Sequence, residues 1–386
     1  MRVISIWRKD LVHINKTRDN HFRYYGKYFD FTLLVSSKKN FGPHIVKNNT
    51  KIVVVNGKGG VPFFYIRCFA WIMRQHYKRN FDALLTPIGE EPVGWLLSLL
   101  LLPNRPKLIY DLWDLPGHSV TSYSFFHPKR YFIKTYYYLL KKILKKGDVV
   151  ISGILSKGLE KYNIDSSKII RSENGIQPEA FSNNILVSGH DEWKWVGDKF
   201  QKILYIGYIH KTRGADLLVE YALYIKNHNV LAKILIVGPS DETTFERLCK
   251  KINEFGVEDV VHLHRELPSS CIPRVIADAD ICICALDNIE KYKWSYPVKI
   301  YEYLASGKAV VASDLLGISE IIINGYNGLL YKAEDNKDFY SKVNSIIDNR
   351  MLRDKLQKNA ALSVENKTYE SIVCRISQSI NTILRV

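Results

Sequence analysis

The sequence predicts an α/β protein made of two doubly wound parallel-sheet domains. Short apolar runs typical of buried strands alternate with helix-length segments along almost the whole chain. The chain has 386 residues, which favours two domains over one large core. A polar, irregular stretch at 187–201 separates two similar alternating patterns and is the expected linker.

The first half contains six predicted strands with helical segments between several of them. The predicted helical segments are 61–79, 92–102 and 128–146. The predicted strands are RVISIW at 2–7, FTLLVS at 31–36, KIVVVN at 51–56, ALLTPI at 83–88, KLIYDLW at 107–113 and DVVISG at 148–153. Alternation of this kind predicts a parallel sheet covered by helices on both faces.

The second half repeats the rhythm with six further strand-like runs. They are KILYIGYI at 202–209, AKILIVG at 232–238, VVHLHR at 260–265, ADICICAL at 279–286, AVVASD at 309–314 and NGLLY at 327–331. In domains of this class a ligand binds at the carboxyl ends of the strands. We therefore expect a ligand in the cleft between the two domains.

Charge and cysteine usage narrow the classes of function. The formal net charge is +16, which favours anionic partners such as nucleotides, nucleic acid or an anionic membrane surface. No helix-turn-helix, zinc or RNA-binding signature accompanies the scattered basic residues, so we expect no nucleic-acid partner. The six cysteines form no C-x-x-C pair, which indicates reduced thiols in a cytosolic protein and neither a zinc site nor a disulfide framework.

The chain is expected to be soluble. Its first residues, MRVISIWRKD, lack the apolar core of a signal peptide. The longest apolar run, at 94–103, is about half as long as a membrane span requires.

The segment YPVKIYEYLASGKAVVASD at 296–314 carries the strongest local signal for a site. Its pattern predicts a helix from Val298 to Ala305, with Pro297 suited to its first position and Gly307 as a left-handed end. Ser295 or Tyr296 would be the cap, and Ser295 has the better chemistry for it. A buried strand follows. Lys299 and Glu302 share one helical face.

Those two charged residues suit a nucleotide. A helix N-terminus and a lysine attract phosphate, and a carboxylate accepts hydrogen bonds from ribose hydroxyls. From the residues alone, a surface ion pair explains Lys299 and Glu302 equally well.

The segment 130–148 predicts an amphipathic basic helix. We expect its apolar face to pack on the sheet, while its basic face could rest on anionic lipid headgroups. The apolar face is Phe132, Ile133, Tyr136, Leu139, Leu140, Ile143 and Leu144; the basic face is Arg130, Lys134, Lys141, Lys142, Lys145 and Lys146.

Four pieces of the chain, in order, resemble the retaining, nucleotide-sugar-dependent glycosyltransferases of the GT4 type with the GT-B fold. The first half resembles the family loosely, through YDLWDLPG and DVVISGILSKGLEKY. The four pieces are IRSENGIQPEAF at 170–181, ILYIGYIHKTRGADLLVEYA at 203–222, ILIVGPSDE with VHLHRELPSSCIPRVIADADICICAL, and the whole of 296–331.

The resemblance implies the domain organisation. It implies an acceptor-side Rossmann-like domain at 1–190 and a nucleotide-sugar-binding Rossmann-like domain at 196–365. A C-terminal helix at 366–386 is expected to cross back to the first domain.

The resemblance also implies roles for residues of the second half. Glu302 matches the glutamate that holds the donor ribose, and Arg213 matches a basic residue that holds the donor diphosphate. Gly207 matches the glycine that lets the backbone approach the ligand. Lys211 and Lys299 are further candidates for contacts with phosphate, and a surface role is the alternative for each. Stabilising the diphosphate leaving group in this way requires no metal or cofactor.

One position departs from the family pattern. The family commonly has a glutamate eight residues before the one that Glu302 matches, and Trp294 stands there. Tryptophan can stack on a sugar but accepts no hydrogen bond from its hydroxyls. Glu290 is the neighbouring carboxylate that could replace it. The sequence therefore leaves open which donor sugar is bound and whether the protein transfers it.

In the first half, the loop after the strand at 107–113 supplies the candidates for the acceptor side. Asp114 is the candidate to orient or deprotonate an acceptor hydroxyl, and His118 is the second candidate. Turn capping by Asp114 and a surface position for His118 are the alternatives. No enzymic nucleophile is assigned.

The resemblance implies sugar transfer from a nucleoside-diphosphate sugar to an acceptor hydroxyl, with retention and without metal. The expected setting is envelope, capsule or lipopolysaccharide glycan synthesis on a lipid-linked acceptor. The protein would be cytoplasmic, with peripheral contact to the inner membrane face. The alternatives are a GT-B-fold nucleotide-sugar epimerase and a degenerate nucleotide-sugar-binding protein.

Overall fold

The computed structural model divides the chain into two compact units. Unit 1 comprises Met1–Asn174 and Tyr369–Val386, and unit 2 comprises Gly175–Thr368. The structure describes residues 1–7, 16–37, 45–47, 50–56, 58, 60–87, 93–94, 96–97, 104–112, 128–181, 193, 196–197 and 199–385.

The boundary between the units precedes the predicted linker at 187–201. Residues after Asn174 already belong to unit 2, because the backbone N–H of Ile176 donates to Lys367 O over 2.9 Å. The short helix η5 (Pro178–Phe181) contacts α9 (Val298–Ala305) of the same unit. The two units of the structure thus divide after Asn174, before the limits of 190 and 196 that the resemblance implies.

Unit 1 contains a sheet with the strand order β3-β4-β2-β1-β5-β6-β7-β8. All described pairs are parallel except β3 with β4, so an antiparallel edge strand is added to the predicted sheet. The order reverses between β1 and β5, which is the switch point of a doubly wound sheet. The strands are β1 (Arg2–Trp7), β2 (Asp30–Ser37), β3 (Ile45–Lys47), β4 (Thr50–Asn56), β5 (Ala83–Pro87), β6 (Lys107–Leu112), β7 (Val149–Ser152) and β8 (Ile169–Arg171).

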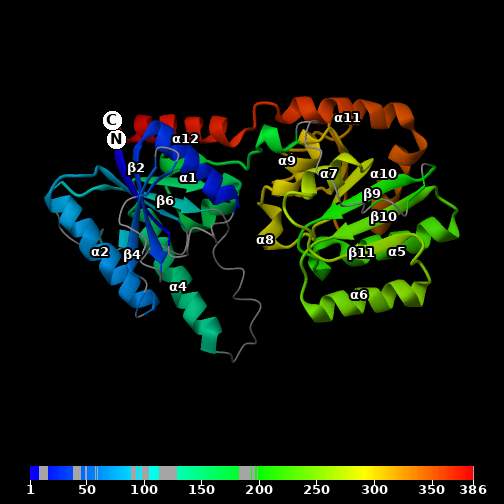
Figure 1. The fold of residues 1–386 in the computed structure, drawn as a ribbon, viewed down its shortest axis with the longest axis horizontal. Helices are drawn as coiled ribbons and strands as arrows, with labels where there is room; N and C mark the ends of the chain where they lie inside the picture. The colour runs from blue at the N-terminus through cyan, green and yellow to red at the C-terminus, as the bar shows by residue number, and fades with distance from the viewer. Residues whose placement is uncertain are drawn as a thin grey trace. The chain divides into compact units, whose positions relative to one another are not determined.

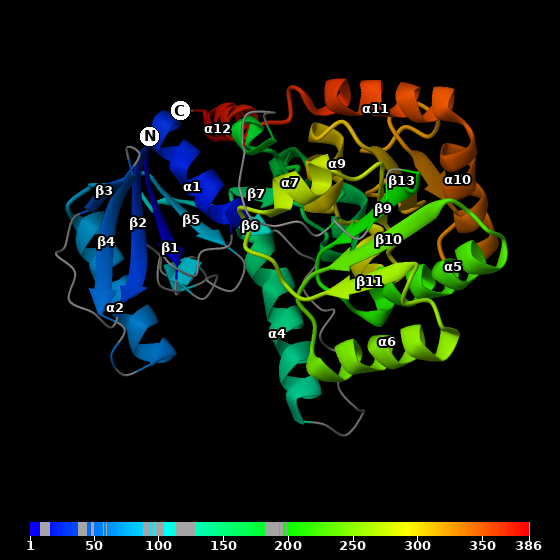
Figure 2. The ribbon, with the colours of Figure 1, turned by 45° about the vertical axis from the view of Figure 1, so that its right-hand side comes forward.

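The end of the chain completes the core of unit 1. Helix α12 (Tyr369–Leu384) lies beside α1 (Lys16–Tyr28) in both ribbon views (Figures 1 and 2). Ile372, Val373 and Ile376 of α12 are fully buried in one apolar cluster with strand residues of the sheet. Lys27 Nζ lies 2.6 Å from Glu370 Oε1.

Two further helices of unit 1 follow strands of the sheet. They are α2 (Val61–Tyr77) and α4 (Pro128–Lys145), which match the predicted segments 61–79 and 128–146. On α4, Leu140, Ile143 and Leu144 are buried as predicted. Leu139, expected on the buried face, is 39% exposed, so the apolar face is narrower than predicted. Short 3-10 helices, η3 (Ser156–Tyr162) and η4 (Ser166–Lys168), precede β8.

Unit 2 contains an all-parallel sheet with the order β11-β10-β9-β12-β13-β14 in its described pairs. This order reverses between β9 and β12, so the switch point lies between these two strands. The strands are β9 (Gln201–Ile206), β10 (Ala232–Val237), β11 (Val261–His264), β12 (Ile281–Cys284), β13 (Ala309–Ser313) and β14 (Leu329–Tyr331).

The helices of unit 2 cover its sheet and build a separate core. That core contains fully buried residues of β9, β10, β12 and β13 together with α5 and α10. The elements are η6 (Lys211–Arg213), α5 (Ala215–Asn227), α6 (Glu242–Phe255), α7 (Ile272–Ala277), α8 (Glu290–Lys293), α9 (Val298–Ala305), α10 (Asn336–Asp348) and α11 (Arg350–Val364).

The segment at 296–314 folds largely as its residues predict. Helix α9 has the predicted limits, Gly307 has a left-handed φ of 63°, and the buried strand β13 follows. The cap differs from the prediction. Pro297 occupies the N-cap position, and Ser295 Oγ donates instead to Tyr292 O over 3.0 Å.

Within the described part of the chain, none of the helices combines the length and apolarity needed to cross a membrane.

Candidate functional site

The carboxyl edge of the unit 2 sheet brings several predicted site residues together. The loop after β9 carries Gly207, Lys211 and Arg213, and α9 begins beyond β12. Because β9 and β12 flank the switch point, their loops border the crevice in which doubly wound sheets bind ligands.

Two glycines allow the loops after β9 and β10 to touch through their backbones. Gly207 has φ 129° and Gly238 has φ 155°. A Cβ on Gly238 would lie 2.0 Å from Gly207 O, so no side chain fits there. The loops are therefore held together by close backbone packing.

Lys299 lies against the turn at Gly207. A Cβ on Gly207 would lie 3.0 Å from Lys299 Nζ. That ammonium lies 3.8 Å from the centroid of the Tyr205 ring, a close cation–π contact. Nζ is shielded from water and has no hydrogen-bond partner among the described residues.

The surroundings of Lys299 oppose its positive charge. Burial, and to a lesser degree the nearby Arg213, lowers the pKa of Lys299 from 10.5 to about 8, although Cys284 and Glu302 act in the opposite direction. A buried amine without a counterion is an unusual feature of a folded protein and is typical of an anion-binding site in its ligand-free state.

Arg213 is held by aromatic side chains at the end of η6. Its Nε donates to the hydroxyl of Tyr292 over 3.1 Å, and its guanidinium carbon lies 5.2 Å from the Tyr292 ring and 5.9 Å from the Tyr208 ring. The next residue, Gly214, has φ 84°, and a Cβ there would lie 2.4 Å from Ala285 Cβ. The glycine thus fixes the turn that presents Arg213.

The remaining predicted donor residues occupy different environments. Glu302 is half-buried, on α9 with Lys299, and its charge favours the protonated lysine. Lys211 is exposed on η6, which agrees with the alternative of a surface lysine.

Trp294 lies directly after α8 and is 9% exposed. Its indole Nε1 has no hydrogen-bond partner among the described residues, and Lys293 Nζ lies 5.2 Å from its ring centroid. Glu290 is exposed at the start of α8. The buried group beside the site is therefore a hydrogen-bond donor, where the family pattern has an acceptor.

Ser240 is a site candidate that the sequence analysis did not single out. In the described part of unit 2, three buried side-chain polar atoms have no hydrogen-bond partner: Ser240 Oγ, Trp294 Nε1 and Lys299 Nζ. All three lie in segments that follow strands β10 and β12. Unsatisfied buried polar atoms are rare, so their grouping at one edge indicates a ligand site. The position of Ser240, just after a strand and the Gly238 turn, was the available signal.

The acceptor-side candidates, Asp114 and His118, lie outside the described residues. Earlier in the sequence, Asp111 at the carboxyl end of β6 is 2% exposed. Burial raises the pKa of Tyr25, and the charge of Asp111 adds to that effect.

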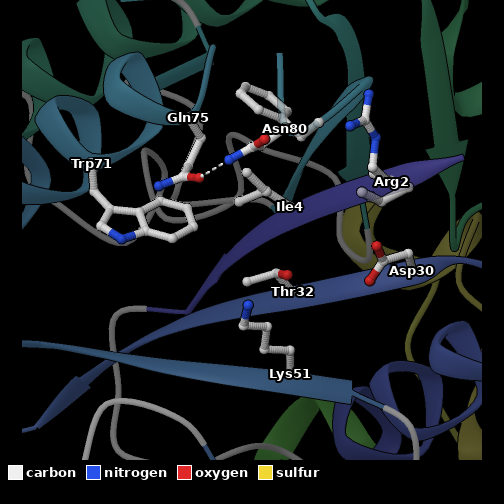
Figure 3. A pocket seen from close by; sticks show the side chains of 10 residues that line it. Arg2, Ile4, Asp30, Thr32, Lys51, Trp71, Gln75 and Asn80 are labelled. Carbon is white, nitrogen blue, oxygen red and sulfur yellow. Dashed lines mark hydrogen bonds between the residues drawn. The ribbon is translucent and has the colours of Figure 1, made fainter. Parts of the chain in front are cut away.

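Unit 1 has a polar cavity of about 280 Å³ at the amino end of its sheet (Figure 3). Arg2 and Asp30, the first residues of β1 and β2, line it together with Lys51 and Trp71. Two of its lining side chains pair with each other, because Asn80 Nδ2 donates to Gln75 Oε1 over 2.9 Å. The cavity contains none of the predicted site residues.

The described residues include no group of three or more histidine, cysteine, aspartate or glutamate side chains arranged to hold a metal ion.

Comparison with protein families matches residues 191–363 to the family "Glycosyl transferases group 1". An alpha-1,3-N-acetylgalactosaminyltransferase of Campylobacter jejuni that acts on N,N'-diacetylbacillosaminyl-diphospho-undecaprenol is 31% identical over 44% of this chain and 42% of its own length. The capsular polysaccharide biosynthesis glycosyltransferase CapM of Staphylococcus aureus is 25% identical over 74% of this chain and 72% of its own length. The chain thus spans less than half of the first of these relatives.

Solved structures confirm the GT-B fold. Anabaena HepE in complex with UDP and glucose superposes with a TM-score of 0.76 at 14% identity, covering 99% of this chain and 100% of HepE. WaaG, a glycosyltransferase involved in lipopolysaccharide biosynthesis, gives a TM-score of 0.65 at 13% identity, covering 99% of both chains. The predicted fold class is confirmed, and the predicted resemblance to glycosyltransferases is supported by the family match over residues 191–363.

Proposed function

We propose that this protein, whose residues 191–363 match the family "Glycosyl transferases group 1", transfers a sugar from a nucleoside-diphosphate sugar to an acceptor hydroxyl. The observation that carries the proposal is the buried, unpartnered Lys299 Nζ beside the Gly207 turn and Arg213. A diphosphate would supply the missing negative charge.

The proposed chemistry uses charge stabilisation of the leaving group. When the glycosidic bond breaks, the diphosphate gains negative charge, which Arg213 and Lys299 would stabilise. Glu302 would hold the ribose hydroxyls, with Lys211 as a weaker candidate at the phosphates. We propose that this transfer needs no metal or cofactor, because two cations of the chain would stabilise the leaving group. We also propose that it retains the anomeric configuration, as the resemblance implies. Asp114 or His118 would orient the acceptor hydroxyl.

The donor and acceptor classes rest on the relatives. HepE structures contain UDP or UDP-glucose, and the Campylobacter relative is named for an acceptor linked to undecaprenol diphosphate. We propose a nucleoside-diphosphate sugar as donor and a lipid-linked glycan as acceptor, within envelope or capsule glycan synthesis. The family match does not support the epimerase alternative.

Product analysis tests this function. The protein is incubated with UDP-N-acetylgalactosamine or UDP-glucose and an undecaprenyl-diphosphate-linked saccharide. Transfer is expected to leave the anomeric configuration unchanged and to persist in excess EDTA. Donor binding without transfer or hydrolysis under any of these conditions would favour the degenerate binding protein instead.

We also propose peripheral contact of unit 1 with an anionic membrane, at the cytoplasmic face. All six cysteines are free, which suits a reducing compartment. On α4, Lys141, Lys142 and Lys145 are exposed, and Tyr138, 60% exposed, lies 4.7 Å from Lys142 Nζ. Basic residues beside exposed aromatic rings suit a lipid headgroup region.

Helix α2 adds apolar surface to this proposal. Phe63 is 54% exposed and Ile66 is 62% exposed, and no acidic residue occurs between Val61 and Tyr77. Because α2 follows β4, its first turns lie at the carboxyl edge of the unit 1 sheet. The last turns of α4, which carry the lysines, precede β7 and lie toward the amino edge, so the two helices offer separate points of contact. Polar substitution of exposed apolar residues is not expected to weaken the fold.

Vesicle sedimentation tests the membrane contact. Phosphatidylglycerol vesicles are expected to bind the wild type, and the double variants K141E/K142E and F63S/I66S are expected to bind at least tenfold more weakly. Met351→Ser is the control, because Met351 is 84% exposed on α11, in unit 2 and outside the unit proposed to touch the membrane. Equal binding by all four proteins would contradict the contact.

A further inference from the structure

Lys299 is surrounded by side chains from four elements. Tyr205 comes from β9, Cys284 from β12, Arg213 from η6 and Glu302 from α9 itself. Burial raises the pKa of the Cys284 thiol, so that neighbour is uncharged at neutral pH. Burial likewise raises the pKa of Tyr205, which therefore stays a neutral phenol.

The two charged neighbours act in opposite directions on Lys299. Arg213 disfavours a second positive charge, and Glu302 favours it. Neither forms a hydrogen bond with Nζ, which has no partner among the described residues. A protonated amine at this place is thus desolvated without a bound counterion, which costs free energy.

We propose that binding of an anionic ligand at this site transfers a proton from the solvent to Lys299 Nζ. The ligand-free site then contains a fraction of neutral lysine, and the occupied site contains an ammonium. This inference rests on the proposed function, which makes the ligand a diphosphate. In this step the lone pair of Lys299 Nζ accepts one proton from water or buffer, and no other bond forms or breaks.

Proton uptake and ligand affinity are expected to change with pH in opposite directions. The pKa of Lys299 in the ligand-free protein is lowered to about 8, and a bound diphosphate raises it again. Proton uptake is therefore small below this pKa, where the lysine is already protonated, and approaches one proton per ligand above it. Affinity falls as pH rises, by up to about tenfold per pH unit.

Protonation of Lys299 also favours the nucleoside diphosphate product over the nucleoside-diphosphate sugar donor. A nucleoside diphosphate carries one more negative charge than its sugar conjugate, so it stabilises the protonated lysine more strongly. As the sugar departs, the site thus becomes more completely cationic. That is the direction in which a group stabilises the leaving diphosphate more than the bound donor.

Calorimetric titration with UDP, GDP and dTDP in two buffers tests the inference. Near a pH of about 8, where the terminal phosphate of these ligands is fully ionised, binding is measured in Tris and in HEPES, which differ in ionisation enthalpy. For the wild type, the observed enthalpy is expected to differ between the buffers by the proton uptake. An identical enthalpy in both buffers, with clear binding, would overturn the inference and leave the proposed function standing.

Three variants sharpen the test. Lys299→Arg is expected to bind without buffer dependence, because a guanidinium stays protonated. Lys299→Met is expected to bind at least tenfold more weakly, also without buffer dependence. Lys308→Met is the matched control: burial lowers the pKa of Lys308 too, but this residue precedes β13, at the amino edge of the sheet. Its proton uptake should equal that of the wild type.

Two outcomes separate the claims. Proton uptake that persists in Lys299→Arg would assign the proton to another group and overturn the inference. Failure of all three nucleotides to bind the wild type at any pH would instead contradict the proposed function. If Lys299→Arg does not fold, the wild-type affinity from pH 7 to pH 9 decides the matter, because a constant affinity contradicts proton uptake.

Discussion

At the scale of single residues, Lys299 is the group on which the donor site depends most. Its Nζ is shielded from water, has no described hydrogen-bond partner and rests on the Tyr205 ring. Such a group lowers the stability of the ligand-free protein, and a ligand that pairs with it restores stability by mass action.

Lys299→Met is expected to stabilise the ligand-free protein. The native pKa is lowered from 10.5 to about 8, so the unfolded chain binds more protons between these values. The stability contributed by this lysine therefore rises with pH across that range. Methionine should raise the free energy of unfolding by about 1–3 kcal/mol at neutral pH, and the gain should vanish near pH 10.

Urea unfolding of wild type and variant at several pH values measures this difference. Lys293→Met, which changes a half-exposed lysine nearby, is the control and should show no such pH dependence. A destabilised Lys299→Met protein at neutral pH would show that the lysine has a counterion in the ligand-free state.

Gly207→Ala is expected to conflict with Lys299. A Cβ there would lie 3.0 Å from Nζ and 3.2 Å from Cε, at a φ of 129° that disfavours any side chain. We expect Gly207→Ala to lower the free energy of unfolding by about 1–3 kcal/mol, from the clash and the backbone strain together. In the double variant with Lys299→Met, whose side chain can move aside, part of that loss should be recovered.

A double-mutant cycle by thermal unfolding measures the coupling. Gly238→Ala serves for comparison, because its Cβ would lie 2.0 Å from the backbone O of Gly207. Lys299→Met should therefore recover none of the stability that Gly238→Ala loses. Additive effects of Gly207→Ala and Lys299→Met would contradict the contact between them.

At the scale of elements, α12 shows how the end of the chain stabilises unit 1. Ile372, Val373, Ile376 and Ile380 have no exposed surface. Ile376→Ala should lower the free energy of unfolding by about 2–4 kcal/mol. Glu370→Ala, which removes an exposed ion pair with Lys27, should leave the unfolding midpoint unchanged.

Chemical denaturation followed by circular dichroism compares these two variants with the wild type. Equal stability of Ile376→Ala and wild type would mean that α12 does not belong to the core of unit 1.

Local signals predicted some elements well and others poorly. The limits of α9 and the left-handed Gly307 follow from residues adjacent in sequence, and both agree with the structure. The cap at Ser295 was wrong because Tyr292 O, one turn earlier, binds its hydroxyl. Leu139 has the right spacing for the buried face, yet it is 39% exposed.

The site was only partly predictable from the sequence, because part of it depends on contacts between segments far apart in the chain. Lys299, Arg213 and Gly207 lie in recognisable motifs, but the unsatisfied Ser240 Oγ depends on how the loops after β9 and β10 pack. The antiparallel strand β3, a three-residue edge, carries too few residues for an alternating pattern. Contacts between distant segments decide both features.

At the scale of the whole molecule, two units share one doubly wound plan, each with a switch point beside its first strand. The family match covers unit 2 through most of its length, and the three unsatisfied polar atoms of its described part gather at its carboxyl edge. The central claim is therefore that unit 2 binds the nucleoside diphosphate of the donor.

A thermal-shift panel tests that claim most directly. UDP, GDP, dTDP, CMP and their sugar conjugates are added to wild type, Glu302→Ala and Glu254→Ala, the last an exposed glutamate on α6 as control. We predict that one nucleoside diphosphate raises the midpoint of wild type and Glu254→Ala by several degrees, and that Glu302→Ala loses most of this shift. Stabilisation by none of these ligands, or an equal shift in all three proteins, would contradict a donor site at the carboxyl edge of unit 2.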